Sequence, residues 1–410
     1  MMSEAGGNQT PGRVVAEYLE SSAPEAIRHI DELAHNANAA FRTIDPQGVV
    51  TPPIAAHYEK PETVWHALHT QRQQLMRGNP PVWIVALVNN PASAPSGTGE
   101  ICDTIRTFQA DFPELPLTFA EHTFPERPKA GRLKKMASDL GLAVLRSHFG
   151  ENLPERIALM SQDIDTIRLS PQYNRRLLKP VLDQGYAVSQ ANVRHENSGG
   201  RFPNMDQVLF WYDLQIAMNP FAWHDAHNAI LADAYCRFRG YDPDLDMGEG
   251  ILLQKKITHL PSDLKRILLR NAGVYAAVSP RRPFAYLQQG ISPTEMWSQD
   301  FSLEDTYRHM SLDDMQDISS STAKEILVHL MREGSDMYGV QPTLDRTQRS
   351  LRSHWAALVS HRYFALREQV DRYAVSEVAL WRQAEQDIEQ LKRTGRFILQ
   401  TIANYQAQQG

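Results

Sequence analysis

Two aspartates with one residue between them follow a short apolar run in Arg156–Leu169, RIALMSQDIDTIRL. The run Ile157–Met160 is too short to predict a helix and suits a strand that is covered on both faces. In an extended segment, residues two apart point to the same side, so Asp163 and Asp165 can face one spot. A divalent cation requires such a pair of carboxylates. The spacing therefore predicts a cation site, and a polar turn is the alternative.

A second group of aspartates repeats this spacing in YDPDLD, at Asp242, Asp244 and Asp246. A calcium loop that begins at Asp242 needs glycine at its sixth position and glutamate at its twelfth. Met247 and Leu253 occupy those positions, so a calcium loop is excluded. The Asp-x-Asp spacing alone is thus weak evidence, and the context of each pair must decide.

A third polar cluster lies in NPFAWHDAHNAI, which brings His224, Asp225 and His227 together. A spacing of three residues can place both histidines on one face of a helix, as in some metal sites. Two histidines and one aspartate nevertheless fall short of a zinc motif. The start of a helix, with Asp225 near its N-cap, is the alternative.

The elements that must position these groups alternate between strand and helix in the middle of the chain. Strands are predicted over 81–88, 115–122 and 156–161, and helices over 99–112 and 131–141. Lys134 and Lys135 are expected on a solvated face of the last helix. This alternation is typical of a mostly parallel sheet wrapped by helices. Ligands of such sheets bind outside the carboxyl ends of the strands, which is where Asp163 and Asp165 are expected.

Helical segments flank this core. Residues 1–80 are expected to form a disordered start and a helical arm broken near Pro24, in which the Pro-rich stretch 45–61 precedes a further helix. The core is expected over 81–300. Residues 301–410 are predicted to form a helical region, which can pack on the core, pair with a second copy or lie on a membrane surface.

Composition narrows the class of protein. The 410 residues carry a formal net charge of -6, which argues against nucleic-acid binding as the main role. No apolar run approaches the roughly 18 residues of a membrane span, and the polar start lacks the apolar core of a signal peptide. The two cysteines, Cys102 and Cys236, form no ligand cluster and fit a reducing compartment. We expect a cytoplasmic protein, with peripheral contact at the inner face of the membrane left open.

The order of the motifs resembles that of the GT-A fold, family-two-like glycosyltransferases. It runs from IVALVNNP through FAEH, KAGRLKKMASDLGL and ALMSQDIDT to HNAILADAYCRFRGYDPDLDMGEGILLQKKI. The resemblance covers about Pro81 to Ile257, under half of the chain. It implies an α/β fold with a GT-A-like (Rossmann-like), mostly parallel sheet flanked by helices.

The resemblance also implies a site for a nucleotide-diphosphate sugar donor. The first strand ends in a turn that starts the nucleotide site, the second ends in an acidic residue near the base, and a basic segment lies close to the diphosphate. The matching residues are Val88, Asn89, Asn90, Glu121, Lys129 and Arg132. Asp163 and Asp165 match the family's metal motif for Mn²⁺ or Mg²⁺, and His259 matches a further metal ligand of retaining relatives.

An acceptor site is implied by the later motifs. Trp223 would stack on a sugar ring, and His224 or Asp225 would hydrogen-bond its hydroxyl groups. Inverting relatives carry their general base in a Glu-Asp pair, whereas here Gly250 follows Glu249. Either Glu249 is the base, or the mechanism is not inverting, or the protein is catalytically silent. Glu249 also simply suits the start of a helix.

We therefore interpret the chain as a metal-dependent glycosyltransferase that moves a sugar from its donor to a saccharide or other hydroxyl acceptor. A nucleotidyltransferase is one rival, but it predicts a basic Gly-rich loop after the first strand, and NNPASAPSGTGE contains no Lys or Arg. A non-catalytic carbohydrate- or nucleotide-binding relative that acts in assembly is the other. Gly250 favours that relative, whereas the intact Asp163 and Asp165 oppose it.

Overall fold

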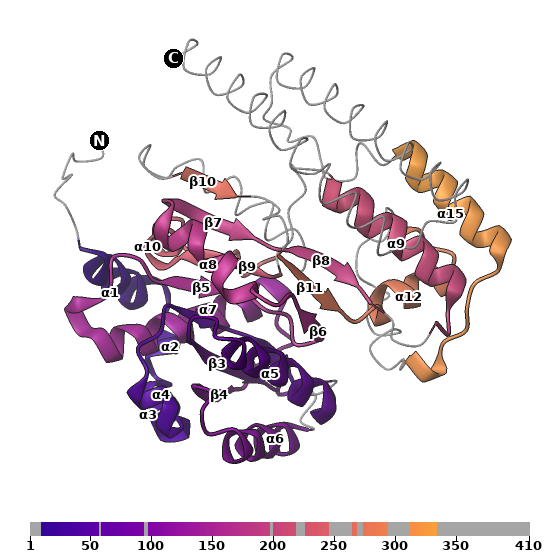
Figure 1. Ribbon diagram of the computed structural model, residues 1–410. Coiled ribbons are helices and arrows are strands. Elements are labelled where there is room, and N and C mark those ends of the chain that lie inside the picture. The colour runs from indigo at the N-terminus through magenta and orange to yellow at the C-terminus, as the bar shows by residue number, and fades with distance from the viewer. Residues whose placement is uncertain are drawn as a thin grey trace, which may run out of the picture. The chain divides into compact units, whose positions relative to one another are not determined.

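The computed structural model describes residues 10–56, 59–93, 97–196, 200–218, 226–245, 265–268, 274–293 and 312–333 (Figure 1). These residues belong to two compact units. The first comprises the residues up to 191 together with 224–276, and the second comprises 192–223 and the residues from 277 onward. Within the described ranges, no helix combines the length and the apolar composition that crossing a membrane requires.

Helices begin the first unit. They are α1 (Pro11–Ser22), α2 (Pro24–Ile27), α3 (Ile30–Asn36), α4 (Ala39–Thr43) and α5 (Pro61–Met76). Proline opens α1, α2 and α5, because the N–H that it lacks is one that the start of a helix leaves unpaired anyway. The Asn38 side chain caps α4 by accepting a hydrogen bond of 3.0 Å from the amide of Phe41. Near Pro24, where a break was predicted, α1 ends at Ser22 and α2 begins at Pro24.

A mostly parallel sheet forms the centre of the first unit. Its strands are β1 (Gly48–Val50), β2 (Pro53–Ala55), β3 (Val82–Asn89), β4 (Leu117–His122), β5 (Ala158–Met160), β7 (Tyr186–Gln190), β9 (Asn228–Leu231) and β10 (Lys265–Leu268). β3 lies between β4 on one side and β1 with β2 on the other, and the order continues through β5, β9 and β7 to β10. β9 is antiparallel to both of its neighbours. The predicted fold class, an α/β fold with a mostly parallel sheet flanked by helices, is confirmed.

The Pro-rich stretch 45–61 supplies β1 and β2, whereas we expected it to separate the arm from a further helix. β1 pairs with both β3 and β5, so it lies in the middle of the sheet. Just after β1, the amide of Thr51 donates to the carbonyl of Met160 over 2.9 Å. Pro52 and Pro53 have no N–H and interrupt the ladder, which splits the strand into two pieces too short to recognise in the sequence.

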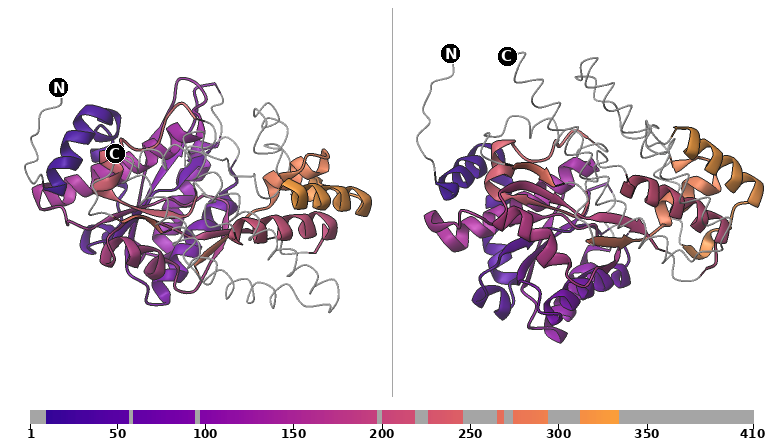
Figure 2. Two further views of the ribbon diagram at one scale, coloured as in Figure 1. Left: turned by 90° about the horizontal axis from the view of Figure 1, so that it is seen from above. Right: turned by 45° about the horizontal axis from the view of Figure 1, so that its top comes forward.

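Helices cover the sheet, as the further views in Figure 2 show. α6 (Thr98–Asp111) joins β3 to β4, α7 (Ala130–Phe149) joins β4 to β5, and α8 (Tyr173–Asp183) precedes β7. The chain moves outward from β1 to β4 and then returns to β5, so right-handed crossovers place α7 on the face opposite α5 and α6. Consistently, α5 packs on α6, and α7 packs on α1, α2 and α3.

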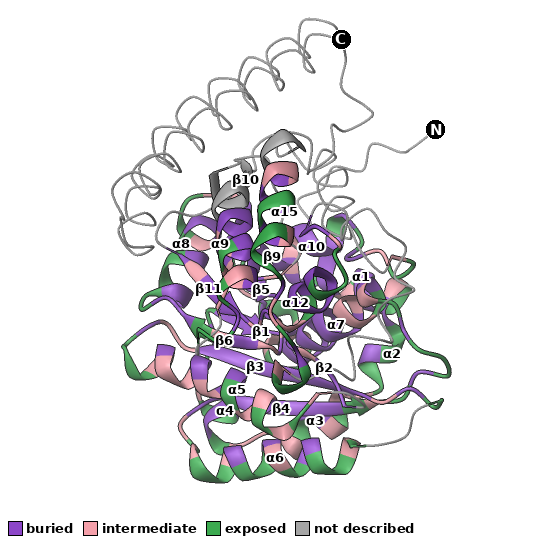
Figure 3. Cartoon of the chain, turned by 90° about the vertical axis from the view of Figure 1, so that its right-hand side faces the viewer, coloured by how far each residue is buried: buried purple, intermediate pink, exposed green. Residues whose placement is uncertain are grey.

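Every residue of β3 is buried, and Figure 3 shows the core strands in the buried colour. The helices and strands predicted between 81 and 161 are confirmed.

The second unit is built mainly from helices. It contains β8 (Asn192–His195), α9 (Pro203–Met218), α12 (Arg281–Gln288), a 3-10 turn (Leu312–Asp314) and α15 (Ser320–Glu333). The Asp317 carboxylate accepts hydrogen bonds of 3.0 Å from the amides of Asn204 and Met205, and thereby caps the start of α9. α15 belongs to the predicted helical C-terminal region, whose residues 334–410 lie outside the described ranges.

Two further strands are short. β6 (Thr166–Leu169) belongs to the first unit, and β11 (Tyr275–Val278) runs from the first into the second. In the first unit, the amide of Ser170 donates to the carbonyl of Tyr275 over 3.0 Å. In the second, the amide of Glu196 donates to the carbonyl of Val278 over 3.1 Å.

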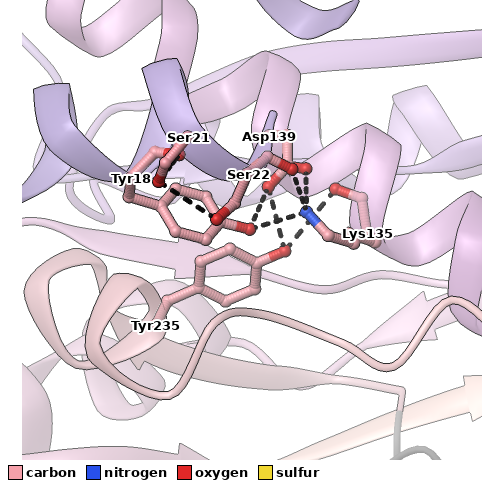
Figure 4. Close-up of polar contacts among 6 residues, drawn as sticks. All are labelled: Tyr18, Ser21, Ser22, Lys135, Asp139 and Tyr235. Atoms are coloured by element: carbon pink, nitrogen blue, oxygen red, sulfur yellow. Dashed lines mark hydrogen bonds and ion pairs between the residues drawn. The ribbon is translucent and has the colours of Figure 1, made fainter. Parts of the chain in front are cut away.

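A buried polar cluster ties the N-terminal arm to α7 (Figure 4). Lys135 Nζ donates to Asp139 Oδ2 over 2.6 Å and to the hydroxyl oxygen of Tyr18 over 2.7 Å. The Tyr18 hydroxyl donates in turn to Asp139 Oδ1 over 2.9 Å, and the hydroxyl of Tyr235, on α10 (Ala232–Arg237), donates to the same oxygen over 3.3 Å. The Lys135 side chain is only 16% exposed, so the expectation of a solvated lysine is wrong. The hydrogen-bonded carboxylate compensates the charge that burial would otherwise leave alone.

Asp139→Ala is expected to lower the free energy of unfolding by about 3 kcal/mol, because it leaves the Lys135 ammonium buried without its counter-charge. Urea denaturation measures the change. Asp103→Ala is the matched control, since Asp103 pairs with Arg106 on the surface, where both side chains are more than half exposed. That control should change the free energy by about 0.5 kcal/mol or less. Equal losses in the two variants would contradict this account.

Candidate functional site

The carboxyl ends of the parallel strands meet at one edge of the sheet. β7 runs parallel to β5, because both are antiparallel to the strand β9 between them, so the amino end of β9 lies at the same edge. The strand order reverses at β1, which has β3 on one side and β5 on the other. Ligands of open α/β sheets bind at such a reversal. The segment that follows β5, with Asp163 and Asp165, therefore lies where a ligand is expected.

Buried polar residues gather at this edge. They are Thr51, Asn89, Ser161, Gln162, Ser189, Gln190 and Asn228. Gln162 is satisfied within the protein, since its Oε1 accepts a hydrogen bond of 2.6 Å from Gln71 Nε2 on α5. By contrast, other buried side-chain atoms at this edge have no hydrogen-bond partner among the described residues. They include Nδ2 and Oδ1 of Asn89 and Oγ of Ser189. Buried groups of this kind are costly unless water or a ligand completes their hydrogen bonds.

Asp163 and Asp165 lie in a turn and not in the extended segment that we expected. The carbonyl oxygen of Asp163 accepts hydrogen bonds from both the amide and the hydroxyl group of Thr166, so the chain bends directly after Asp163. Ile164 is buried between the two aspartates, which are themselves half-buried. The polar turn that was the alternative is therefore present, and the cation site stays a prediction at this position.

The donor chemistry of this turn fits Mg²⁺ or Mn²⁺. Across the described ranges, no three His, Cys, Asp or Glu side chains come together in a way that could hold a metal ion. Mg²⁺, however, is usually held by one or two carboxylates together with waters and substrate phosphates, so two aspartates suffice. The other predicted ligand and the predicted acceptor and base residues lie outside the described residues; they are His259, Trp223, His224, Asp225 and Glu249.

His227 is buried beside this turn, just before β9. Its backbone has a φ of 60°, and the described residues around it form a bend and a strand, so the expected helix start does not include it. Its Nε2 lies 3.3 Å from Thr166 Oγ1, and its Nδ1 lies 3.0 Å from the hydroxyl oxygen of Tyr173. Both ring nitrogens are thus engaged, and His227 is not available as a metal ligand.

Burial keeps the His227 ring neutral. It lowers the pKa of His227 to about 4, the nearby Asp163 carboxylate opposes this shift, and Lys134 adds to it. Burial also raises the pKa of Tyr173 well above its usual value, so this hydroxyl keeps its proton. The ring is therefore a hydrogen-bonding group at neutral pH and not a charge.

The predicted nucleotide residues of β3 lie at its carboxyl end. Val88 is fully buried, so its side chain belongs to the core. The carbonyl of Asn89 accepts a hydrogen bond of 2.9 Å from the amide of Ala56, just beyond β2, and the amide of Asn90 donates to the carbonyl of His122 over 3.3 Å. The structure thus brings the ends of β2, β3 and β4 together, with the Asn89 amide buried among them.

Glu121, predicted to lie near the nucleotide base, is exposed at the end of β4. Its amide donates to Glu32 Oε1 over 2.7 Å. The buried thiol of Cys102 lies against its carboxylate, and burial together with this hydrogen bond raises the pKa of Cys102. Next to it, His122 Nδ1 and His29 Nε2 are 3.1 Å apart, and burial lowers the pKa of His122. The arm therefore contacts the strand end directly.

The predicted basic segment lies at the start of α7 and contacts the loop 241–245. Lys129 Nζ donates to the carbonyl of Asp244 over 2.9 Å, and the amide of Gly131 donates to that of Leu245 over 2.8 Å. A Cβ atom at position 131 would lie 2.0 Å from the carbonyl oxygen of Asp242, so only glycine fits. Arg132 lies over the ring of Phe124, 5.0 Å from its centroid. The structure thus joins a predicted donor segment to the loop that the resemblance assigns to the acceptor side.

Sequence reasoning missed the groups whose partners are distant in the chain. Gln162 directly precedes Asp163 at the end of a predicted strand, and this position could have identified it as a residue of the candidate site. Thr166 and His227 are 61 residues apart, and no local pattern connects them. Ser189, whose hydroxyl group has no partner among the described residues, was missed because its strand, β7, was not predicted.

No known protein family matches this chain, and no curated protein matches it. Solved structures do match, and two of them match with low overall scores. The match to a mycobacterial protein covers 59% of this chain and 67% of that protein's chain, with 16% identity and a TM-score of 0.30. Glucosyl-3-phosphoglycerate synthase from Mycobacterium tuberculosis, solved with Mn²⁺, uridine diphosphate glucose and phosphoglyceric acid, matches 81% of this chain and 86% of its own, with 13% identity and a TM-score of 0.28. At such TM-scores, the function proposed below rests on this chain's own residues alone.

Gly131→Ala is expected to destabilise the first unit by about 1–3 kcal/mol, because its methyl group must push the loop 241–245 away from α7. Thermal unfolding measures the change. Gly99→Ala, also near the start of a helix, is the control, since nothing lies within 4 Å of its Cβ position. A Gly131→Ala protein as stable as this control would show that the loop is not held against α7.

The stability of the protein is expected to fall as the pH decreases from about 6.5 to 4, in part because of His227. The unfolded chain binds a proton at this histidine near pH 6.5, and the folded chain resists protonation down to about pH 4. Stability is therefore complete above the unfolded pKa and is lost below it, by about 3 kcal/mol at pH 4.

The measurement is the free energy of unfolding between pH 7 and pH 4 for wild type and His227→Gln. Over this range, the free energy of unfolding of the variant should fall by about 3 kcal/mol less than that of wild type. His35→Gln, at an exposed histidine on α3, should keep the wild-type profile. Parallel profiles for wild type and His227→Gln would contradict the buried, neutral ring.

Proposed function

We propose that this protein is a metal-dependent glycosyltransferase that moves a sugar from a nucleotide-diphosphate donor to a hydroxyl group of an acceptor. The observation that carries the proposal is the position of Asp163 and Asp165, directly after β5, where the strand order reverses. On the same edge, the Asn89 amide is buried and has no partner among the described residues. It offers a hydrogen-bond donor and an acceptor to a polar ligand.

Asp163 and Asp165 are the residues that would hold Mn²⁺ or Mg²⁺. Bound there, such an ion supplies positive charge for the diphosphate that leaves when the acceptor oxygen attacks the anomeric carbon. The half-burial of both carboxylates supports this role, because a partly desolvated carboxylate interacts more strongly with a cation than one in open water.

Lys129 and Arg132 are the chain's own cations for the donor. They flank the start of α7, where the helix adds the partial positive charge of its amino end. Lys129 is fixed on the carbonyl of Asp244, and Arg132 is held over Phe124, so both side chains have defined places before a ligand arrives. Charge that is positioned in advance stabilises a developing anion without the cost of reorganisation.

The acceptor half of the proposal comes from the sequence. Trp223, His224 and Asp225 are proposed to bind the acceptor, Glu249 to take its hydroxyl proton, and His259 to complete the metal site. We place the reaction in the cytoplasm, and both cysteines of the chain have free thiols. The metal, donor and acceptor would then meet at one edge of the sheet.

Titration of UDP and GDP by calorimetry, with and without Mn²⁺, tests the donor site. Wild type should bind one nucleotide with a Kd on the order of micromolar only when the metal is present. Asp165→Ala should weaken this binding at least about tenfold, because one of the two carboxylates is lost. Asp111→Ala, at an exposed aspartate at the end of α6, should bind like wild type.

Two outcomes would redirect the assignment. No binding of either nucleotide under any condition would contradict the transferase and favour an interaction protein on the same fold. Binding that is equally tight without metal would contradict metal dependence and leave a nucleotide-binding relative. A screen for hydrolysis of the matching sugar nucleotides would follow a positive result and identify the sugar.

A further inference from the structure

A chain of contacts leads from α8 to the Asp163–Asp165 turn through His227. The hydroxyl group of Tyr173 is hydrogen-bonded to Nδ1 of the ring, and Nε2 is hydrogen-bonded to the hydroxyl group of Thr166. Thr166 in turn binds the carbonyl oxygen of Asp163. Tyr173, Thr166 and His227 are all buried, so bulk water does not compete with these hydrogen bonds.

The proton positions in this chain follow from the number of hydrogens available. The hydroxyl group of Thr166 has one hydrogen and donates it to the carbonyl of Asp163, so toward His227 it can only accept. Nε2 must then carry the ring proton. A neutral ring with Nε2–H leaves Nδ1 as an acceptor, which the Tyr173 hydroxyl satisfies by donating. Each of the three hydrogen bonds thus has a single direction, from Tyr173 and from His227 toward the turn.

The backbone of His227 is also held in a conformation that it would not adopt alone. A φ of 60° lies in the left-handed region, which costs a residue with a Cβ atom on the order of 1 kcal/mol. The carbonyl of His227 accepts a hydrogen bond of 2.9 Å from the amide of Ala191, beyond β7. The next carbonyl, of Asn228, accepts one of 2.9 Å from the amide of Ser161, beyond β5. Such strain persists only where the surroundings over-determine it, and it is concentrated at functional sites.

We propose that His227 is a positioning residue for the Asp163–Asp165 turn, holding Thr166 on the Asp163 carbonyl through an Nε2–H hydrogen bond. This inference rests on the function proposed above. The ring nitrogens are engaged by Thr166 and Tyr173, so the ring acts on the metal-binding groups through the backbone that carries them. Partners in the outer shell of metal sites commonly orient the ligands in this way, and their loss typically costs about 10–100-fold in metal affinity.

His227 is also close in the sequence to the residues proposed to bind the acceptor. His227 lies two residues after Asp225, the last of the three residues proposed to bind the acceptor. The segment that would carry the acceptor therefore leads directly into the residue that fixes the metal turn.

Thr166→Val and Thr166→Ser form the matched pair that tests the proposal. Valine removes the hydroxyl group at nearly constant shape, whereas serine keeps it. We expect Thr166→Val to bind Mn²⁺ about tenfold or more weakly in the presence of the nucleotide, and Thr166→Ser to bind it like wild type. Mn²⁺ affinity is read from the electron paramagnetic resonance of the free ion, at a temperature where denaturation curves show each variant folded. A merely structural role would lower stability without changing Mn²⁺ affinity in the folded protein.

Nitrogen-15 NMR of the histidine rings tests the proton position without any metal. The His227 signals, identified by their absence in His227→Gln, should show a neutral ring with the proton on Nε2 at pH 7. Thr166→Val should shift the Nε2 signal, and Tyr173→Phe should shift the Nδ1 signal. A ring with its proton on Nδ1 would overturn the proposal, whatever the binding data show.

The outcomes separate the two proposals. If wild type binds nucleotide in a Mn²⁺-dependent way and Thr166→Val keeps the wild-type Mn²⁺ affinity, the positioning role is wrong and the proposed function stands. If wild type shows no metal-dependent binding, the proposed function fails and the positioning role fails with it. If Thr166→Val and Thr166→Ser both lose affinity equally, the hydroxyl group is not the feature that matters, and the positioning role is again wrong.

Discussion

The pairing of β1 with β3 on one side and β5 on the other is the constraint on which the rest of the first unit depends. Because this three-residue strand lies in the middle of the sheet, the chain must leave it through α5 and α6 and return to it through α7. The return places the end of β5 beside the end of β1. The candidate site, with Asp163 just beyond β5, therefore owes its position to the strand order.

Polar interactions in the interior then fix how the layers meet. The Lys135–Asp139 pair, with Tyr18 and Tyr235, joins α1, α7 and α10 at one point of the core. Buried charges contribute little net stability, but a fully hydrogen-bonded pair penalises any arrangement that would separate its members. The contact between Gly131 and the loop 241–245 acts in the same way at the amino end of α7, since it leaves no room for a side chain.

The sequence was a good guide to the long elements and a poor one to the contacts between distant residues. β3, α6 and α7 carry continuous apolar patterns, and the rule that ligands bind at strand ends placed Asp163 and Asp165 at the reversal of strand order. β1 and β2 were missed because three residues beside prolines give no periodicity. The burial of Lys135 depends on Tyr18, 117 residues away, and Thr166 contacts His227, 61 residues away. Such pairings are set by the fold and leave no local pattern to read.

The N-terminal helices have a consequence for where a shortened chain could begin. The carbonyl of Ile44 accepts the indole N–H of Trp83 over 2.7 Å, and the carbonyl of Leu33 accepts the hydroxyl hydrogen of Thr118 over 2.6 Å. Phe41 also stacks on Trp83, with ring centroids 4.3 Å apart. A chain cut just before β1 would strip these partners from β3 and β4 and leave buried donors unpaired. A shortened chain that keeps these partners must therefore begin before α3, and helices that resemble an extension in the sequence form part of the core.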